Sequence, residues 1–538
     1  MGAEPAAVPN PDQLVAKIQN TAADAGPNVP DRGYAAIGTN RRTLSKVLRS
    51  AAVSTVVNTL TALFVLPRVL HGIGTRSYGD WATLAAVLAI GQLAEAGVST
   101  EIARRVATAH GHGDSEGMRR SVRQGTTVLV GIAGLLEITG VVVAHPVVNL
   151  VFTKSPASQR EQLVWVLICL TTLVAIGLVG NGYFGILTGL QRTDYQNWSG
   201  IASLLVSAGV TVGGIALGFG IWALLLAAYV QLLVGWIGPA IGLRRVVPDM
   251  RFRLTKVSPN VVLGFIGMPA MMVFASASTL FDMQFDKLVL TRTVGPSPSA
   301  MFQIGAQLVL SAKTVALIPL AILLAGTAEL YRTNPGRLRR LEKLAGSTAQ
   351  AIAAVTAGGF LIFSSSFVRV WLGPGYGGAA LSMRLLAIAV LLNVWVAPWF
   401  YYAVGRGRYH YVAWSASANL VVNAAGTIFL TTRIGLLGAL IGSIAGNAAG
   451  NLVGWLILRR WERRHWLLPA FRATGVVAMV VVPLLAIENR IPTSWIGLIG
   501  WGAAYLVACG IMLLVTRSVP LTIGLSPSGL PRVGWQAE

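Results

Sequence analysis

Long apolar stretches alternate with short polar connectors along most of the chain. About fourteen of these stretches reach roughly 20 residues, the length a helix needs to cross a bilayer. They are centred near Val57, Ile90, Gly134, Thr172, Val210, Leu232, Pro269, Lys313, Val355, Leu392, Val421, Ser443, Val480 and Leu506. The pattern predicts an all-α polytopic membrane protein. An even number of spans places both termini on one side, and the connectors are too short to hold a folded extramembrane domain.

Composition agrees with a membrane protein and excludes an ordinary soluble globule. Of the 538 residues 54% are hydrophobic and 12% charged, about half the usual share of charge. The net charge of +22 combines 42 Lys and Arg with 20 Asp and Glu, so it reflects a shortage of acids and implies no nucleic-acid partner. Cys169 and Cys509 both lie in apolar stretches, which indicates neither a disulfide framework nor a thiolate metal site.

The basic residues predict the orientation. Most of those near the predicted membrane ends fall in alternate connectors, within 41–49, 104–123, 244–256, 332–343 and 459–472. By the positive-inside rule these connectors are cytoplasmic, so both termini are too, and we expect a multi-pass protein of the bacterial plasma membrane. Residues 1–45 lack the apolar core of a signal peptide and are predicted to form a disordered cytoplasmic tail. Residues 517–538 form the C-terminal tail.

Two halves of the chain repeat each other at an offset of about 220 residues. The segment 74–77 aligns with 295–298, and the basic turn 119–120 aligns with 339–340. Gly189, Arg192 and Trp198 match Gly405, Arg408 and Trp414, and 233–236 matches 452–455. The matches predict two pseudo-symmetric six-helix lobes around a central cleft, which is the arrangement that alternating access uses. The N-lobe is expected over 46–245 and the C-lobe over 246–460, followed by two extra helices over 461–516.

Three motifs carry a resemblance to a known family. Residues 70–81 (LHGIGTRSYGDW) resemble the LG-x-x-x-YG-x-[WY] turn after the first helix of bacterial polysaccharide exporters of the oligosaccharide flippase type. Residues 285–290 (FDKLVL), followed by Gly295, are similar to the D-[KR]-x-x-[IL] signature of their seventh helix. Residues 185–192 (GILTGLQR) are similar to the G-x-x-x-G-x-x-[RK] turn after their fourth helix.

The resemblance implies a two-lobed, fourteen-helix transporter of the multidrug and oligosaccharidyl-lipid exporter superfamily. Such a protein moves polyprenyl-diphosphate-linked oligosaccharides, the precursors of surface polysaccharides, from the inner to the outer leaflet. Membrane lipids surround such a protein, and a polysaccharide polymerase or glycosyltransferases are its expected partners. The energy for transport is expected from a gradient of H⁺ or Na⁺, or from consumption of the product outside the cell without a coupling ion. The resemblance implies no cofactor.

Ionisable residues within an apolar span are costly, so each is a functional candidate. Gln92, Glu95 and Ser99 recur at helical spacing, which predicts one polar face that looks into the cleft. Lys313 lies in the middle of the eighth span, and the repeat pairs it with Gln92, one turn from Glu95. We expect Lys313 to bind the diphosphate of the substrate, although a lysine that only fixes helix packing is the alternative. Glu95 is either a cleft residue or the counterion of Lys313.

The remaining candidates divide into two groups. The other residues of the predicted substrate cleft are Arg384, Asn58 and Gln307. The gating or coupling candidates are Asp282, Asp286, Lys287 and Glu137. For Asp286 and Lys287 an exterior helix cap or salt bridge is the favoured alternative, and for Glu137 it is a hydrogen bond between helices.

Competing functions meet specific obstacles in the sequence. An enzyme is not expected, because a membrane glycosyltransferase needs acidic catalytic residues in its first outer loop and usually a large soluble domain. The loop 71–80 has about ten residues and holds one Asp. The chain has no phosphate-binding G-x-x-x-x-G-K-[ST] loop. His110, His112 and Asp114 lack further ligands at a spacing that suits a metal.

A cation-coupled drug exporter is the main alternative, yet Lys313 and Arg384 favour an anionic substrate. A peptidoglycan-precursor flippase is expected to carry cleft arginines in its first two spans, and 51–66 and 82–103 contain none.

Overall fold

The computed structural model of the chain describes residues 41–91, 96–246, 254–266, 284–461, 467–516, 518, 521–525 and 531–535. The helices are α2 (Arg41–Gly91), α3 (Ala96–Gly111), α4 (Ser115–Val151), α5 (Ala157–Gly189), α6 (Asp194–Ala216), α7 (Ile221–Val246), α8 (Pro259–Ile266), residues 284–293, α10 (Pro296–Thr333), α11 (Pro335–Leu372), α12 (Gly377–Gly405), α13 (Tyr409–Ile434), α14 (Leu436–Trp461), α15 (Leu467–Ala486), the 3-10 turn η2 (Glu488–Arg490) and α16 (Trp495–Val515). Strands β1 (Leu521–Leu525) and β2 (Pro531–Trp535) pair antiparallel in the C-terminal segment.

The all-helical, two-lobed fold class is confirmed. Among the described residues, 12 helices are long and apolar enough to cross a membrane. The second predicted span divides between α2 and α3, and the seventh between α8 and residues 284–293. The residues between these pieces, 92–95 and 267–283, lie outside the described part. Helix α2 begins at Arg41. The predicted domain boundaries remain expectations.

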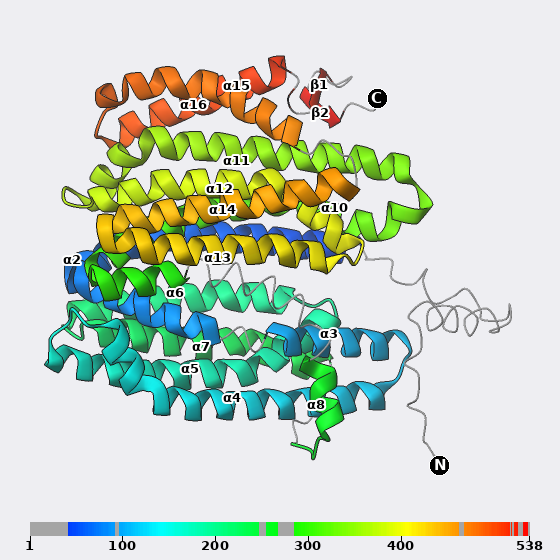
Figure 1. Cartoon of the computed structure of the whole chain (residues 1–538). Coiled ribbons are helices and arrows are strands. Elements are labelled where there is room, and N and C mark those ends of the chain that lie inside the picture. Colours follow the sequence, from blue (N-terminus) through cyan, green and yellow to red (C-terminus); the bar gives the residue numbers. More distant parts are fainter. Residues whose placement is uncertain are drawn as a thin grey trace, which may run out of the picture.

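The lobes lie side by side (Figure 1). Helices α3 to α7 form the N-lobe together with α2 beyond Gly74, and residues 284–293 with α10 to α14 form the C-lobe. Helices α15 and α16 lie against α11 at the far side of the C-lobe (Figure 1). We call the end of the bundle where α11 ends and α12 begins, on the left in Figure 1, the Gly74 end, after the glycine at which α2 turns. The opposite end, where α3 ends and α4 begins, is the Gly113 end.

Matching backbone geometry supports the repeat seen in the sequence. Gly74 interrupts α2 with φ 79°, and Gly295 precedes α10 with φ 129°, so both halves turn at a positive φ where a glycine is favoured. At the other end, Gln191 and Gly407 both have positive φ. The guanidinium of Arg192 lies 4.8 Å from the ring of Tyr195, and its counterpart Arg408 lies 5.6 Å from the ring of Tyr411.

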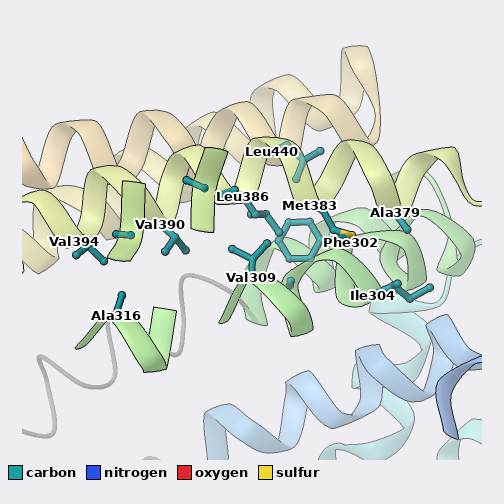
Figure 2. Close-up of a cluster of buried hydrophobic side chains, with 14 of the residues drawn as sticks. Phe302, Ile304, Val309, Ala316, Ala379, Met383, Leu386, Val390, Val394 and Leu440 are labelled. Carbon is teal, nitrogen blue, oxygen red and sulfur yellow. The ribbon is translucent and has the colours of Figure 1, made fainter. Parts of the chain in front are cut away.

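The C-lobe core forms where α10, α12 and α14 meet. Phe302 and Val309 of α10 lie seven residues apart, and Met383 and Leu386 of α12 lie three apart, so each pair occupies one face of its helix. Leu440 of α14 completes this cluster, which Figure 2 shows in close-up. All five side chains are buried. This packing gives the C-lobe a rigid centre against which neighbouring helices are placed.

A row of glycines brings α14 close to α13. Gly438, Gly442, Gly446 and Gly450 recur every four residues along α14, so they share one face. A methyl group at Gly446 would lie 2.6 Å from the Cβ of Asn423 in α13. Because apolar lipid gives no hydrophobic drive for helix association, such close backbone packing is a main source of stability in membranes. The close approach also brings polar groups of both helices together.

Candidate functional site

The two lobes contact each other at the Gly74 end through buried hydroxyl groups. The Oγ1 of Thr83, in α2, lies 2.6 Å from the Oγ1 of Thr291 and 3.1 Å from the Oγ of Ser299 in α10. All three side chains are fully buried. Thr153, after α4, donates a further hydrogen bond of 2.9 Å to the carbonyl oxygen of Arg292. The bundle is therefore closed at the Gly74 end.

The 70–81 motif forms much of this closure. A Cβ placed on Gly79 would lie 1.9 Å from the carbonyl oxygen of Pro296, so only glycine permits the backbones to approach this closely. Asp80 is fully buried and accepts a 2.7 Å hydrogen bond from Nε2 of Gln159. The motif therefore supplies an interlobe contact at Gly79 and a polar anchor within the N-lobe at Asp80.

Asp286 is the centre of a buried polar cluster in the C-lobe. Its side chain is 1% exposed. Its Oδ1 accepts a hydrogen bond of 2.7 Å from Thr427 of α13, and its Oδ2 accepts one of 2.6 Å from Ser443 of α14. Asn423 adds a longer contact of 3.4 Å. The expected exterior helix cap is wrong for Asp286, because close packing of α13 on α14 surrounds the carboxylate with hydroxyl groups inside the lobe.

Lys287 lies beside this cluster with its own partner. Its side chain is 6% exposed, and its Nζ donates a 2.8 Å hydrogen bond to Oε1 of Gln303 in α10. Carboxylate, hydroxyl and amide oxygens around Asp286 are the ligands that hard cations prefer, and a carboxylate can also take a proton. The donor set therefore suits a small cation or a proton.

An apolar groove separates α2, α10, α11 and α16. It has a volume of ≈ 490 Å³. Its walls carry Leu63 of α2, Leu308 of α10, Phe360 and Phe363 of α11, and Leu498 of α16. Gly502 of α16 also lines it, and a Cβ there would meet no atom within 4 Å. The last helix therefore completes a wall that a twelve-helix bundle would lack.

The predicted cleft residues that the structure describes lie on three helices, α2, α10 and α12. Lys313 is half-buried on α10, four residues after buried Val309. Ala312 and Val315 of the same helix line the groove, whereas Lys313 does not line it. Gln307 is half-buried on the same helix, and Asn58 is exposed on α2. Gln92, Glu95 and Asp282 lie outside the described residues.

Two further candidates have partners in neighbouring elements. Arg384, in α12, donates a 2.9 Å hydrogen bond to Oγ of Ser364 and forms an ion pair with Glu488 of η2. Glu137, in α4, accepts a 2.7 Å hydrogen bond from Thr172 of α5. That bond joins two helices, which is the structural role expected for Glu137.

The sequence analysis missed an ion-pair cluster near the Gly113 end. Glu101 of α3 has a side chain that is 4% exposed, and it pairs with Arg104 at 2.6 Å and Arg105 at 2.7 Å. The guanidinium of Arg105 also lies 3.8 Å from the ring of Phe265 in α8. The backbone N–H of Thr255 donates a 3.1 Å hydrogen bond to Oγ1 of Thr127. An acid followed by bases three and four residues later was a readable signal. These contacts attach the segment around α8 to the N-lobe.

Comparison with solved structures identifies the architecture. The lipid II flippase MurJ, in an inward closed conformation, matches with a TM-score of 0.61 and 13% identity, over 87% of this chain and 97% of that one. The chain has the fold of the MurJ and MATE transporters. An inward-facing multidrug resistance MATE transporter of the MOP superfamily gives a TM-score of 0.59 at 16% identity, over 76% of this chain and 97% of that one. A eukaryotic MATE transporter, AtDTX14, gives 0.54 at 17%, over 81% and 98%. No protein-family model and no curated protein matches the chain.

Proposed function

We propose that the protein is a flippase of the bacterial plasma membrane. It carries a polyprenyl-diphosphate-linked oligosaccharide, a precursor of a surface polysaccharide, from the inner to the outer leaflet. The two lobes rock against each other and expose the substrate site first to one leaflet and then to the other. This alternating access is the mechanism that two-lobed transporter folds support. The apolar groove that α16 completes is the observation that carries this proposal.

A polyprenyl lipid needs an apolar path for its chain while its charged head passes between the lobes. The groove supplies such a path, since Phe360, Phe363 and Leu498 line it and Thr59 and Leu63 of α2 form the wall next to the N-lobe. A compact cationic drug has no chain for such a groove to hold. The groove therefore favours the lipid-linked substrate over the drug-exporter alternative.

The closed Gly74 end supports a direction of loading. If the basic connectors are cytoplasmic, the Gly74 end is exterior, and the Thr83–Thr291 contact seals the exterior side. The state described here then loads substrate from the cytoplasmic leaflet. Release to the exterior requires that contact to break.

The Asp286 cluster is the coupling site that we propose. A cation or proton that binds the carboxylate would compete with the hydrogen bonds from Thr427 and Ser443, which come from α13 and α14. Ion binding would thereby change how residues 284–293 pack on both helices. A ligand that interacts differently with two arrangements shifts the balance between them, which is the requirement for coupling.

The proposal is tested by filling the groove. Gly502→Phe places an aromatic ring in open space within it, whereas Gly510→Phe places the same ring in open space elsewhere on α16. In a strain that depends on this protein for its surface glycan, Gly502→Phe should stop export and accumulate a lipid-linked glycan on the cytoplasmic leaflet. Gly510→Phe should behave as wild type at equal protein levels.

Three outcomes would replace the proposal. Undiminished glycan export with Gly502→Phe would remove the groove from the transport path. Loss of resistance to apolar cations on deletion of the gene, with glycan unchanged, would establish the drug exporter. Accumulation of a peptidoglycan precursor would assign the substrate of MurJ to this protein as well.

A further inference from the structure

A polar pocket lies within the N-lobe, among α5, α6 and α7. It has a volume of ≈ 470 Å³. Each helix contributes one face to it, because the lining residues recur every three or four positions. The polar side chains and the ring that line it are those of Asn181 in α5, Gln196 and Ser203 in α6, and Gln231 and Trp236 in α7. None of the described residues that line the pocket is charged.

The pocket lies in the half of the N-lobe toward the Gly113 end. Asn181 lies in the last three turns of α5 and Gln196 in the first turn of α6, and these helices are joined at that end. The Oγ of Ser99, near the start of α3, donates a 3.4 Å hydrogen bond to the backbone oxygen of Asn181. Ser99 belongs to the polar face that the sequence predicts for the cleft. The pocket therefore lies beside the predicted path of the substrate, on the side from which we propose that it is loaded.

Gln231 is a polar residue on the inward face of its helix. The face of α7 that meets lipid is marked by the exposed side chains of Trp222, Leu226 and Leu233. Helical geometry places Gln231 on the opposite face, which it shares with buried Leu224. The side chain of Gln231 is nevertheless exposed. An amide that is exposed on the inward face of a membrane helix indicates a space for water or a polar ligand, because an amide left without hydrogen bonds in an apolar medium is costly.

The C-lobe shows that the fold does not require these amides. At the repeat offset of the α5–α6 and α12–α13 turns, Asn181 corresponds to Ala397. At the same offset Gln196 corresponds to Val412. Ala397 and Val412 are both buried among apolar side chains. Equivalent positions are thus apolar core in one lobe and polar pocket in the other, so the amides have a role beyond holding the lobe together.

The polar groups of the pocket match those of a sugar. An amide side chain both donates and accepts hydrogen bonds, as a sugar hydroxyl does, so Asn181 and Gln231 can pair with hydroxyls in either sense. The Nε2 of Gln196 donates a 2.9 Å hydrogen bond to the carbonyl oxygen of Phe184, which fixes the orientation of this amide. Its Oε1 is then an acceptor for a hydroxyl.

Trp236 adds a flat apolar surface to the pocket. A Cβ placed on Gly180 would lie 2.2 Å from the indole ring, so the glycine lets Trp236 lie against α5. The C–H face of a sugar ring packs on such a surface, while its hydroxyls need polar partners around the edge. A diphosphate would require bases, which the lining lacks, and a polyprenyl chain would leave the amides without hydrogen bonds.

We propose that this pocket binds a neutral sugar unit of the lipid-linked oligosaccharide during loading from the cytoplasmic leaflet. Asn181, Gln196 and Gln231 form hydrogen bonds to its hydroxyls, and the ring of Trp236 packs on its C–H face. The site rests on the proposed flippase function and specifies which part of the substrate the N-lobe recognises.

The test compares ligands that differ only in the sugar. Binding of farnesyl diphosphate and of its glucose, galactose and N-acetylglucosamine conjugates is measured on the purified full-length protein in nanodiscs. At least one conjugate should bind about tenfold more tightly than farnesyl diphosphate. Gln231→Leu and Asn181→Leu should each reduce this preference by about fivefold, because each removes hydrogen bonds to the sugar. Both variants should leave the affinity for farnesyl diphosphate unchanged.

A second variant fills the pocket without removing an amide. Gly200 of α6 lines the pocket, and a Cβ there would meet no atom within 4 Å. Gly200→Phe should therefore abolish the preference for the sugar conjugate. Gly209→Phe is the matched control, because Gly209 lies in open space on the same helix and does not line the pocket. It should keep the wild-type preference.

Two results would overturn this site. The first is that the wild-type protein binds none of the three conjugates more tightly than farnesyl diphosphate. The second is that the preference is unchanged in Gly200→Phe or in both amide variants. In either case the flippase function stands if Gly502→Phe still stops glycan export at equal protein levels. If glycan export does not depend on the protein, the function itself fails.

Discussion

The hydroxyl oxygens of Thr83 and Thr291 lie 2.6 Å apart although 208 residues separate them in the chain. Thr83 belongs to the N-lobe and Thr291 to the C-lobe, and both are fully buried. A hydrogen bond between two short side chains requires the helices that carry them to be in close contact. This pair therefore reports directly whether the lobes are closed at the Gly74 end.

Gly79→Ala is expected to open that end. The added Cβ would lie 1.9 Å from the carbonyl oxygen of Pro296. Because both groups belong to the backbone, a side-chain rotation cannot relieve this clash, so the lobes must move apart. A cysteine at Thr291, with Cys169 and Cys509 replaced by alanine, should react several-fold faster with a membrane-impermeant maleimide. Gly209→Ala, in open space on α6, should not change the rate. Equal rates in both variants would show that the lobes tolerate the methyl group.

Asp286→Asn is expected to abolish the dependence of transport on an ion gradient. The amide keeps the shape of the side chain but loses the charge that would bind Na⁺ or H⁺. Uptake into proteoliposomes with and without each gradient measures this, with Glu116→Gln, at an exposed carboxylate of α4, as the control. Unchanged gradient dependence in Asp286→Asn would move coupling elsewhere.

Thr427→Val tests the same cluster by stability. It removes the 2.7 Å hydrogen bond to Oδ1 of Asp286 and leaves a buried acceptor with fewer donors. Such a loss costs about 1–3 kcal/mol of unfolding free energy. Thermal unfolding in detergent should show a lower midpoint than wild type, whereas Thr432→Val, at an exposed threonine of the same helix, should leave the midpoint unchanged.

Lys313→Ala is expected to abolish glycan export while the protein remains inserted, because the substrate loses a cation for its diphosphate. Lys313→Arg should retain part of the export, and Glu95→Gln should be milder than Lys313→Ala because it removes only the counterion. Export is compared at matched protein levels, and Thr314→Ala, at the exposed neighbouring position, is the control. Export at the wild-type rate in Lys313→Ala would make this lysine structural.

Reporter fusions should place the Gly74 end outside the cell. Fusions after Arg340 should report the cytoplasm and fusions after Lys154 the exterior, because the bases cluster in the connectors of the Gly113 end. An alkaline phosphatase and a green fluorescent protein fused at each position give opposite signals. A stable inversion at either position would reverse the direction of loading proposed above.

The sequence determined the spans and the repeat because both depend on local properties. A helix in lipid satisfies its own backbone hydrogen bonds, so a long apolar run such as the one around Leu506 is sufficient to predict a span. Gly74 and Gly295 were recognisable as matching turns for a similar reason, since each acts on the backbone at its own position. The glycine row of α14 and the Glu101 cluster were also readable, and they were missed.

Only the tertiary structure decided what surrounds each polar side chain. Asp286 was a visible candidate, yet its donors Thr427 and Ser443 lie 141 and 157 residues away, and their own segments carry no mark of that contact. Arg384 was placed in the cleft by its position in a span, whereas its partner Glu488 comes from a turn 104 residues later. Hydropathy specifies which segments enter the membrane, but the rotation and the neighbours of each helix follow from how side chains of distant segments pack together. The apolar groove therefore exists only once the helices are assembled.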